Sequence, residues 1–262
     1  MIQISDTQLN AWLGLMLWPL ARILGVVGVA PVLGDPSVPR TTKIGISLLL
    51  TAALAPALGP MPAVSPGSLE GLAILAQQVL IGVGIGFSMR LVFAAVEGAG
   101  EIIGLQMGLG FATLYDPQNA TSESSVSTLL NILAVLVFLA LDGHLTLFAT
   151  LVESFRLLPV EIHPLASGSM RSLASAGGEV LVAGGMLALP VVAALLIANV
   201  ALGVLTRAAP QLNLFAVGFP ITLSVGLVLI SIMVPYLGST LASMLEHGAA
   251  DAGLFLRAAA QR

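Results

Sequence analysis

The sequence predicts an all-α integral membrane protein, built of about six long hydrophobic helices that are arranged as helical hairpins. Of its 262 residues, 57% are hydrophobic and only 8% are charged, and the mean hydropathy is +1.04. A soluble domain usually carries about 25% charged residues. A soluble protein of this size could not cover its surface with so few charges, so much of the surface must face lipid or apolar protein.

The hydrophobic segments were counted against the roughly 20 residues that a helix needs to span a bilayer. In chain order they are, approximately, Ala11–Leu33, Ile44–Leu58, Leu72–Val96, a segment centred on Leu129–Leu141, Val180–Thr206 and Leu212–Leu241. Polar or Pro- and Gly-rich stretches at 34–40 and 59–67 separate the first three segments. The tail 244–262 mixes charged and apolar residues, which predicts a short amphipathic helix outside the hydrocarbon.

The domain organisation follows from this pattern. We expect residues 1–262 to form a single membrane domain, with an N-terminal helical part at 1–175. Residues 176–262 are expected to form a C-terminal helical hairpin followed by the amphipathic tail.

The C-terminal hairpin carries an unusual charge. From Val180 to Leu245 the only charged side chain is Arg207, and this residue opens a polar break that extends to Pro220. Isolated burial of an arginine charge is costly, so Arg207 needs a partner, water or a lipid head group. Composition is compatible with two interpretations of Arg207: it is an anchor to lipid head groups at a loop, or it is part of a protein interface.

The middle of the chain is rich in glycine. Gly100, Gly104 and Gly108 recur every four residues, so on a helix they form a smooth stripe that lets another backbone approach closely. Helix packing is favoured over a moving hinge. Glu97 and Glu101 also share one helical face. These two carboxylates are either the solvated end of a helix or a functional pair, and the sequence leaves both interpretations open.

The sequence contains no P-loop, His-Glu-x-x-His or Gly-x-Ser-x-Gly motif, its three histidines lack ligand spacing, and cysteine is absent. We therefore expect no catalytic activity, no cofactor and no metal site. A net charge of −4 without a long basic run argues against nucleic-acid binding. A stand-alone secondary transporter of a small solute is the alternative, because Arg207 with Glu97 or Glu101 could mimic a coupling pair. A transporter predicts internal repeats, and none is convincing.

Several motifs resemble the FliR family of flagellar export proteins. The pattern Arg-x-x-Pro-Gln-x-x-x-Phe-x-x-Gly-x-Pro begins at Arg207, and Asn199-Val-Ala-Leu-Gly precedes it. The family also resembles this chain at Trp18-Pro-Leu-Ala-Arg22, at 104–117 and at Asp142-Gly-His-Leu. The matches extend over nearly the whole chain, in the same order and at matching spacing.

The resemblance implies a core subunit of the type III export gate in the bacterial inner membrane, within the flagellar basal body. Such subunits, like their SctT/SpaR relatives of virulence secretion, assemble with FliP and FliQ into a channel for unfolded flagellar substrates. They contact FlhB, and FlhA is a further expected partner. Since no nucleotide motif occurs here, energy coupling is expected mainly in the partners.

The resemblance also assigns roles to residues. The loop at 108–119 resembles the family's plug, which keeps the pore closed, and apolar side chains suit such a seal because they resist hydration. The implied pore and plug residues are Met107, Gly108, Gly110, Phe111, Leu114, Asp116 and Pro117. The implied assembly and packing residues are Gly100, Gly104, Asn199, Arg207, Pro210, Gln211, Phe215, Gly218 and Pro220.

Overall fold

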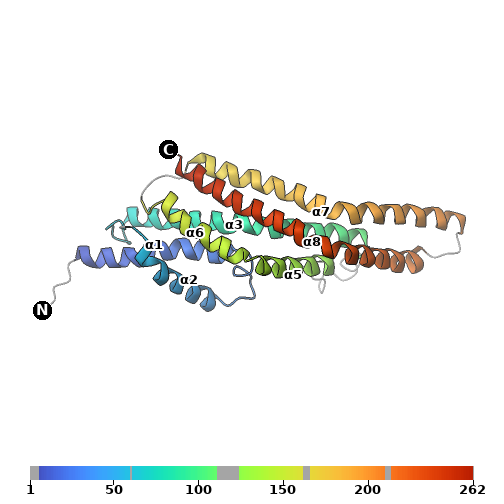
Figure 1. The fold of residues 1–262 in the computed structure, drawn as a ribbon, viewed down its shortest axis with the longest axis horizontal. Coiled ribbons are helices and arrows are strands. Elements are labelled where there is room, and N and C mark those ends of the chain that lie inside the picture. Colours follow the sequence, from blue (N-terminus) through green and yellow to red (C-terminus); the bar gives the residue numbers. More distant parts are fainter. Residues whose placement is uncertain (1–5, 60, 111–123, 162–165, 210–213, 262) are drawn as a thin grey trace. The chain divides into compact units, whose positions relative to one another are not determined.

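The computed structural model describes residues 6–59, 61–110, 124–161, 166–209 and 214–261. All regular elements in these ranges are helical, which confirms the all-α class (Figure 1). The elements are α1 (Asp6–Val29), α2 (Arg40–Leu54), the short 3-10 helix η1 (Ala55–Ala57), α3 (Leu69–Gln106), α5 (Ser125–Ala140), α6 (Gly143–Leu157), α7 (Ser167–Ala208) and α8 (Leu214–Ala260).

Three helices of the described chain are long and apolar enough to cross a membrane, namely α3, α7 and α8. The pair α5 and α6, broken between them, would make a fourth. In its most apolar stretch α3 is 61% buried, against 28% for α7 and 22% for α8. Consequently α3 is a core helix, whereas α7 and α8 expose apolar side chains such as Leu181, Met186 and Ile232.

Several helices differ in length from the predicted segments. The third segment, expected to end near Val96, continues through the glycine-rich run to Gln106. The tail, expected as a separate short helix, is the end of α8. Neither extension contains a proline. Hydropathy falls there because of charged side chains, but these do not interrupt backbone hydrogen bonding.

The break between α5 and α6 lies at Leu141 and Asp142, and the two helices are bent by 66° there. Asp142 has a φ of 54°, in the left-handed region, and its carbonyl accepts from the N–H groups of Leu145 (2.8 Å) and Thr146 (3.2 Å). Aspartate tolerates this conformation better than most residues. Helix α6 was absent from the predicted segments because it is amphipathic: Leu147, Leu151 and Phe155 are buried at four-residue spacing, and the helix also contains His144, Glu153 and Arg156.

By contacts the chain forms two compact units. Unit 1 contains residues 1–91, 142–177 and 245–262, and unit 2 contains residues 92–141 and 178–244. Three long helices, α3, α7 and α8, therefore contribute to both units. The predicted division of one membrane domain near residue 175 stays a prediction.

In unit 1, α1 and α3 approach each other through glycines. A Cβ added at Gly25 would lie 2.7 Å from the carbonyl oxygen of Val79, and one at Gly86 would lie 2.9 Å from that of Val26. Gly82 similarly faces the backbone of Arg22, and Gly84 faces the ring of Phe255 near the end of α8. Small residues at helix contacts are typical of membrane proteins, because close packing rather than hydrophobic transfer holds such helices together.

Candidate functional site at the end of α3

A glycine cap terminates α3 in unit 2. The Leu109 N–H donates to the Gly104 carbonyl (3.0 Å), and the Gly108 N–H donates to the Leu105 carbonyl (3.0 Å). Gly108 has a φ of 85°, which only glycine adopts without strain. These bonds form a Schellman motif with Gly108 as its left-handed residue. The expectation that Gly108 continues a helical glycine stripe is therefore wrong, since this glycine lies just outside the helix and ends it.

Met107, at the same cap, is anchored on α8. Its side chain is only 1% exposed, and its carbonyl accepts a hydrogen bond from the Thr222 hydroxyl (3.2 Å). A Cβ added at Gly226 would lie 2.5 to 2.8 Å from the Met107 side chain, so Gly226 makes room for it. Thr222 and Gly226 were missed by the sequence reasoning, because a threonine and a glycine in an apolar helix carry no local signal.

The other two glycines of the stripe face α5. A Cβ at Gly100 would overlap the backbone of Ser127, and a Cβ at Gly104 would overlap the Ser124 hydroxyl. The contact is reinforced by a hydrogen bond from the Ser127 hydroxyl to the Glu97 carbonyl (2.9 Å). Further along the helices, the rings of Phe93 and Phe138 meet edge to face, with centroids 5.6 Å apart.

Glu101 caps the start of α5. Its carboxylate accepts a hydrogen bond from the Ser124 N–H at 2.7 Å, and the Ser124 hydroxyl accepts from the Val126 N–H at 3.2 Å. A negative charge at a helix N-terminus is stabilising because it faces unpaired N–H groups and the positive end of the helix dipole. Glu101 thus has a capping role that its spacing from Glu97 did not indicate.

The two described flanks of the segment predicted as a plug lie at the same turn of α3, around Gly104. On the leaving side, the Leu109 N–H is bonded to the Gly104 carbonyl; on the returning side, Ser124 packs against Gly104. Of the predicted pore residues, Met107, Gly108 and Gly110 lie on the leaving side. The predicted residues Phe111, Leu114, Asp116 and Pro117 lie outside the described residues.

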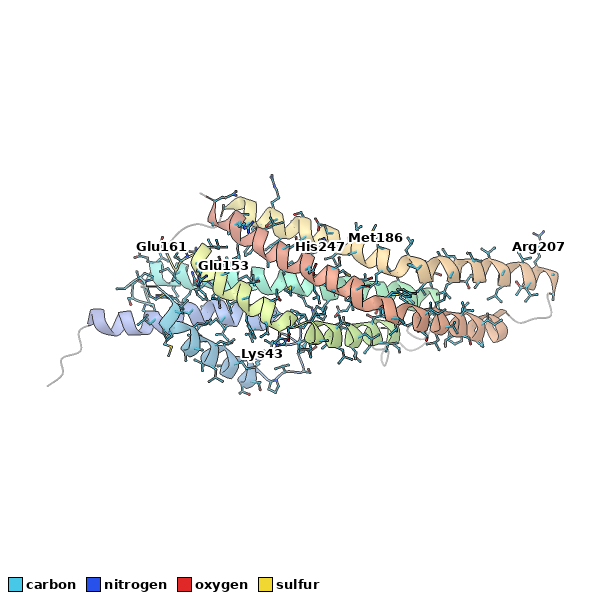
Figure 2. All side chains as sticks on the ribbon, in the orientation of Figure 1. Lys43, Glu153, Glu161, Met186, Arg207 and His247 are labelled. Carbon is cyan, nitrogen blue, oxygen red and sulfur yellow. The ribbon has the colours of Figure 1, made fainter. Side chains whose placement is uncertain are left out.

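The predicted residues of the C-terminal hairpin lie near its connection. Arg207 is exposed in the last turn of α7 (Figure 2), and Asn199 is half-buried two turns earlier. The polar break is shorter than expected, because helix resumes at Leu214; Gly218 is buried and Pro220 is exposed within α8. Pro210 and Gln211 lie outside the described residues, and Phe215 falls in the first turn of α8, where only the backbone is described.

Unit 1 contains a buried cation, Arg22, which the sequence analysis placed in the motif Trp18-Pro-Leu-Ala-Arg22 without giving it a role. Arg22 of α1 has no exposed surface. Its guanidinium donates three hydrogen bonds to uncharged acceptors and lies 4.2 Å from the centroid of the Phe155 ring. The acceptors are Gln78 Oε1 of α3 (2.8 Å), Ser154 Oγ of α6 (3.1 Å) and the carbonyl of Leu158 (2.8 Å).

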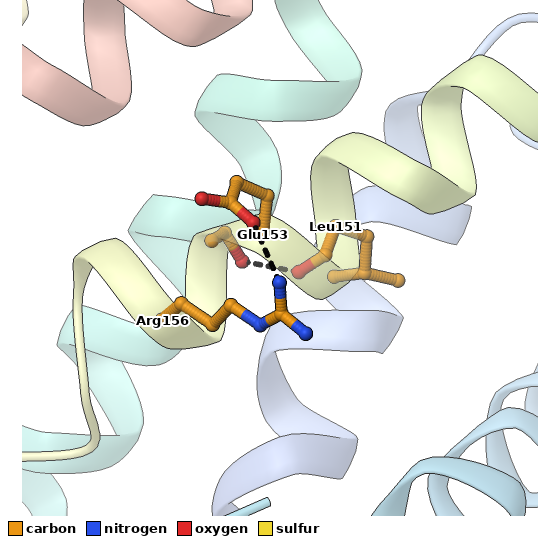
Figure 3. A network of polar contacts seen from close by, with 4 residues as sticks. Leu151, Glu153 and Arg156 are labelled. Atoms are coloured by element: carbon orange, nitrogen blue, oxygen red, sulfur yellow. Dashed lines mark hydrogen bonds and ion pairs between the residues drawn. The ribbon is translucent and has the colours of Figure 1, made fainter. Parts of the chain in front are cut away.

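The location of this cation explains how its charge is tolerated. Leu158 caps the C-terminus of α6, where unpaired carbonyls and the helix dipole concentrate negative potential. The Phe155 ring face adds a cation–π attraction. On the outer side of the same turn, Arg156 forms a solvent-exposed ion pair with Glu153 at 3.5 Å, while the Ser154 hydroxyl donates to the Leu151 carbonyl at 2.6 Å (Figure 3). A lone arginine four residues after a tryptophan in an apolar helix was the available signal.

These features define a helical membrane protein whose long apolar helices meet through glycines and a few buried polar bonds. Among the described residues, no group of three or more His, Asp or Glu side chains could hold a metal ion.

Residues 13–248 match the family described as bacterial export proteins, family 1, and the chain belongs to this family. The chain is 44% identical over 235 residues to the flagellar biosynthetic protein FliR of Escherichia coli strain K12, covering 90% of each chain. It is equally similar to FliR of Pectobacterium carotovorum, and it is 29% identical to FliR of Aquifex aeolicus over 85% of this chain and 86% of the relative. The resemblance to the FliR family that the sequence motifs indicated is therefore confirmed.

Proposed function

We propose that this protein is a core subunit of the flagellar type III protein export gate, located in the bacterial inner membrane at the flagellar basal body. In this proposal it forms, with FliP and FliQ, the channel through which unfolded flagellar substrates cross, and it contacts FlhB and FlhA. The observation that carries the proposal is the similarity to flagellar biosynthetic FliR proteins over nine-tenths of the chain. The long apolar surfaces of α7 and α8 supply area for lipid and for neighbouring subunits.

The proposal includes a plug formed by the loop around 108–119. It is supported by how firmly the described flanks are held: Met107 is bonded to Thr222 of α8, Gly108 caps α3, and Ser124 is bonded to Glu101. Both described flanks of the segment are thus held at one turn of a core helix.

We expect removal of this segment to open the gate to ions. The structure indicates where to cut: residues 111–123 are replaced by about six Gly and Ser residues, which can reach about 20 Å, so that the cap at Gly108 and the α5 start at Ser124 are retained. Ion conductance across vesicles that contain the assembled complex should rise, because the replacement has no apolar side chains to exclude water.

The control for this deletion is a replacement of equal length, 13 Gly and Ser residues, which tests whether bulk alone closes the pore. Recovery of the complex from detergent extracts is measured for both variants. Normal assembly with unchanged conductance in the shortened variant would show that this segment is not a plug.

We further propose that the exposed end of the C-terminal hairpin is an assembly surface. Arg207 is the charge in an otherwise apolar stretch, and it lies exposed in the last turn of α7. Arg207→Ala should lower recovery of the complex with FliP and FliQ about tenfold, which corresponds to about 1.4 kcal/mol. Arg171→Ala, which removes another exposed charge from α7, should not. Equal recovery of both variants would make Arg207 a head-group anchor instead.

A further inference from the structure

Helix α2 is inverted relative to the helices of soluble proteins. Its fully buried side chains are the hydroxyl-bearing Ser47 and Thr51, both 0% exposed. Three of its large apolar side chains point outward: Ile44 is 47% exposed, Leu48 46% and Leu49 73%. The other three, Ile46, Leu50 and Leu54, are half-buried. A helix at a water-facing surface shows the opposite arrangement, with apolar residues inside and polar residues outside.

Helix α2 packs on α1, its neighbour in unit 1 (Figure 1), and its two fully buried side chains are hydrogen-bonded within α2. The Ser47 hydroxyl donates to the Lys43 carbonyl (2.8 Å), and the Thr51 hydroxyl donates to the Ser47 carbonyl (2.7 Å). Each hydroxyl is therefore satisfied within the helix itself, and the small side chains permit a close approach. Small residues inside and large aliphatic residues outside are the arrangement of a helix whose solvent is lipid.

The length of α2 and the position of its polar residues indicate where in a membrane it can lie. Its 15 residues give about 22 Å of helix, so α2 by itself is shorter than the ~30 Å hydrocarbon core. The first turn, Arg40-Thr-Thr-Lys43, is polar, and residues 44–54 contain no charge. A polar turn at one end of a lipid-facing apolar helix is suited to the boundary between head groups and acyl chains.

The charged groups at the polar end of α2 differ in how free they are to bind a ligand. The Lys43 ammonium donates to the carbonyl of Gly34, the residue before Asp35, at 2.9 Å. Hydrogen bonds from Ser37 lower the pKa of Asp35, helped by the charges of Arg90 and Lys43, so Asp35 stays ionised and offsets part of this positive charge. Arg40 is exposed at the start of the helix. It is therefore the group best placed to meet a phosphate.

We propose that α2 is a binding surface for an anionic phospholipid, with acyl chains along Ile44, Leu48 and Leu49 and the head group at Arg40. This surface belongs to unit 1, whereas the end of α3 and the hairpin connection belong to unit 2. The proposal does not depend on the export role. An aliphatic face needs a water-free neighbour, and a guanidinium at its polar end complements an anionic lipid rather than a neutral one.

The absence of cysteine allows the apolar part to be tested directly. A nitroxide spin label is attached to a Leu49→Cys variant of the full-length chain, which is reconstituted with its partners in vesicles of phosphatidylethanolamine and phosphatidylglycerol. Oxygen concentrates in the hydrocarbon and a nickel chelate stays in water, so their collision rates report the surroundings. High oxygen and low nickel accessibility support the proposal. A label shielded from both, which would mean a protein partner, or one open to nickel would overturn it.

The head-group part is tested by native mass spectrometry of the detergent-purified protein with added phosphatidylglycerol or phosphatidylethanolamine. Arg40→Gln should weaken retention of phosphatidylglycerol about fivefold, as expected for about 1 kcal/mol per basic residue near an anionic lipid. It should leave retention of phosphatidylethanolamine unchanged. Arg171→Gln, which removes another exposed arginine, should change neither. Equal losses for both lipids, or for both variants, would overturn the assignment to Arg40.

Discussion

Replacing Arg22 with leucine is expected to destabilise the protein by about 3 kcal/mol or more. The guanidinium satisfies three buried acceptors, on Gln78, Ser154 and Leu158, and leucine satisfies none of them. The Ser154 hydroxyl keeps its bond to the Leu151 carbonyl, but Gln78 Oε1 and the Leu158 carbonyl lose their donor, at a cost of about 1–3 kcal/mol each. Burial of the leucine side chain offsets only part of this loss. Because the three acceptors belong to α3 and to the end of α6, the change should loosen the contact of both with α1.

Thermal unfolding in mild detergent measures this effect, with hydrogen exchange of α6 as a local readout. Arg22→Lys keeps the charge but cannot reproduce the planar fork of donors, so it should rank between the native protein and Arg22→Leu. The matched control is Arg156→Gln, because Arg156 lies in α6 but its ion pair with Glu153 is exposed. Exposed pairs contribute at most about 1 kcal/mol. Similar losses for Arg22→Leu and Arg156→Gln would refute the structural role of the buried cation.

Gly100→Ala is expected to separate α3 from α5. The added Cβ would overlap the backbone of Ser127, which cannot move aside as a flexible side chain can. Overpacking of this kind costs about 1–3 kcal/mol. Over most of this range the cost exceeds the ~1 kcal/mol that alanine gains over glycine in a helix. The variant should therefore unfold at a lower temperature, and it should weaken the hydrogen bond from the Ser127 hydroxyl to Glu97.

The same helix offers a control two residues away. A Cβ at Gly98 would meet no atom within 4 Å, so Gly98→Ala should be neutral or stabilising by up to about 1 kcal/mol. The comparison isolates the helix contact from helix propensity, since both changes are identical and both sites lie in α3. If the two variants shift the unfolding temperature equally, Gly100 does not mediate close packing.

How much the sequence could predict is clear at α3. The apolar run after Leu72 required a membrane helix, and the glycines at 100 and 104 indicated a close contact. The role of Gly108 was misassigned, because a glycine four residues after Gly104 gives the same sequence pattern whether it continues the helix or caps it. Only the φ of 85° at Gly108 and the two capping bonds distinguish these cases.

Glu101 and Arg22 illustrate a second limit. Spacing placed Glu101 on one face with Glu97, yet its partner is the N–H of Ser124, 23 residues further along the chain. Arg22 bonds to Ser154 and Leu158, more than 130 positions away. Long-range polar partners of this kind depend on which helices become neighbours, and local periodicity contains no information about that.

The sequence by itself determined the solvent of this protein, its helical class and its family, because these follow from composition, from the length of apolar runs and from motifs read along the chain. The tertiary structure alone decided where the polar groups are satisfied: a cation against the end of α6, a carboxylate at the start of α5, and a methionine against a glycine of α8. The physical reason is the cost of burying an unpaired polar group, which is met by whichever partner folding brings within hydrogen-bond distance. The outward apolar face of α2 is likewise a property of the tertiary structure, because packing buries Ser47 and Thr51 and leaves Leu48 and Leu49 exposed.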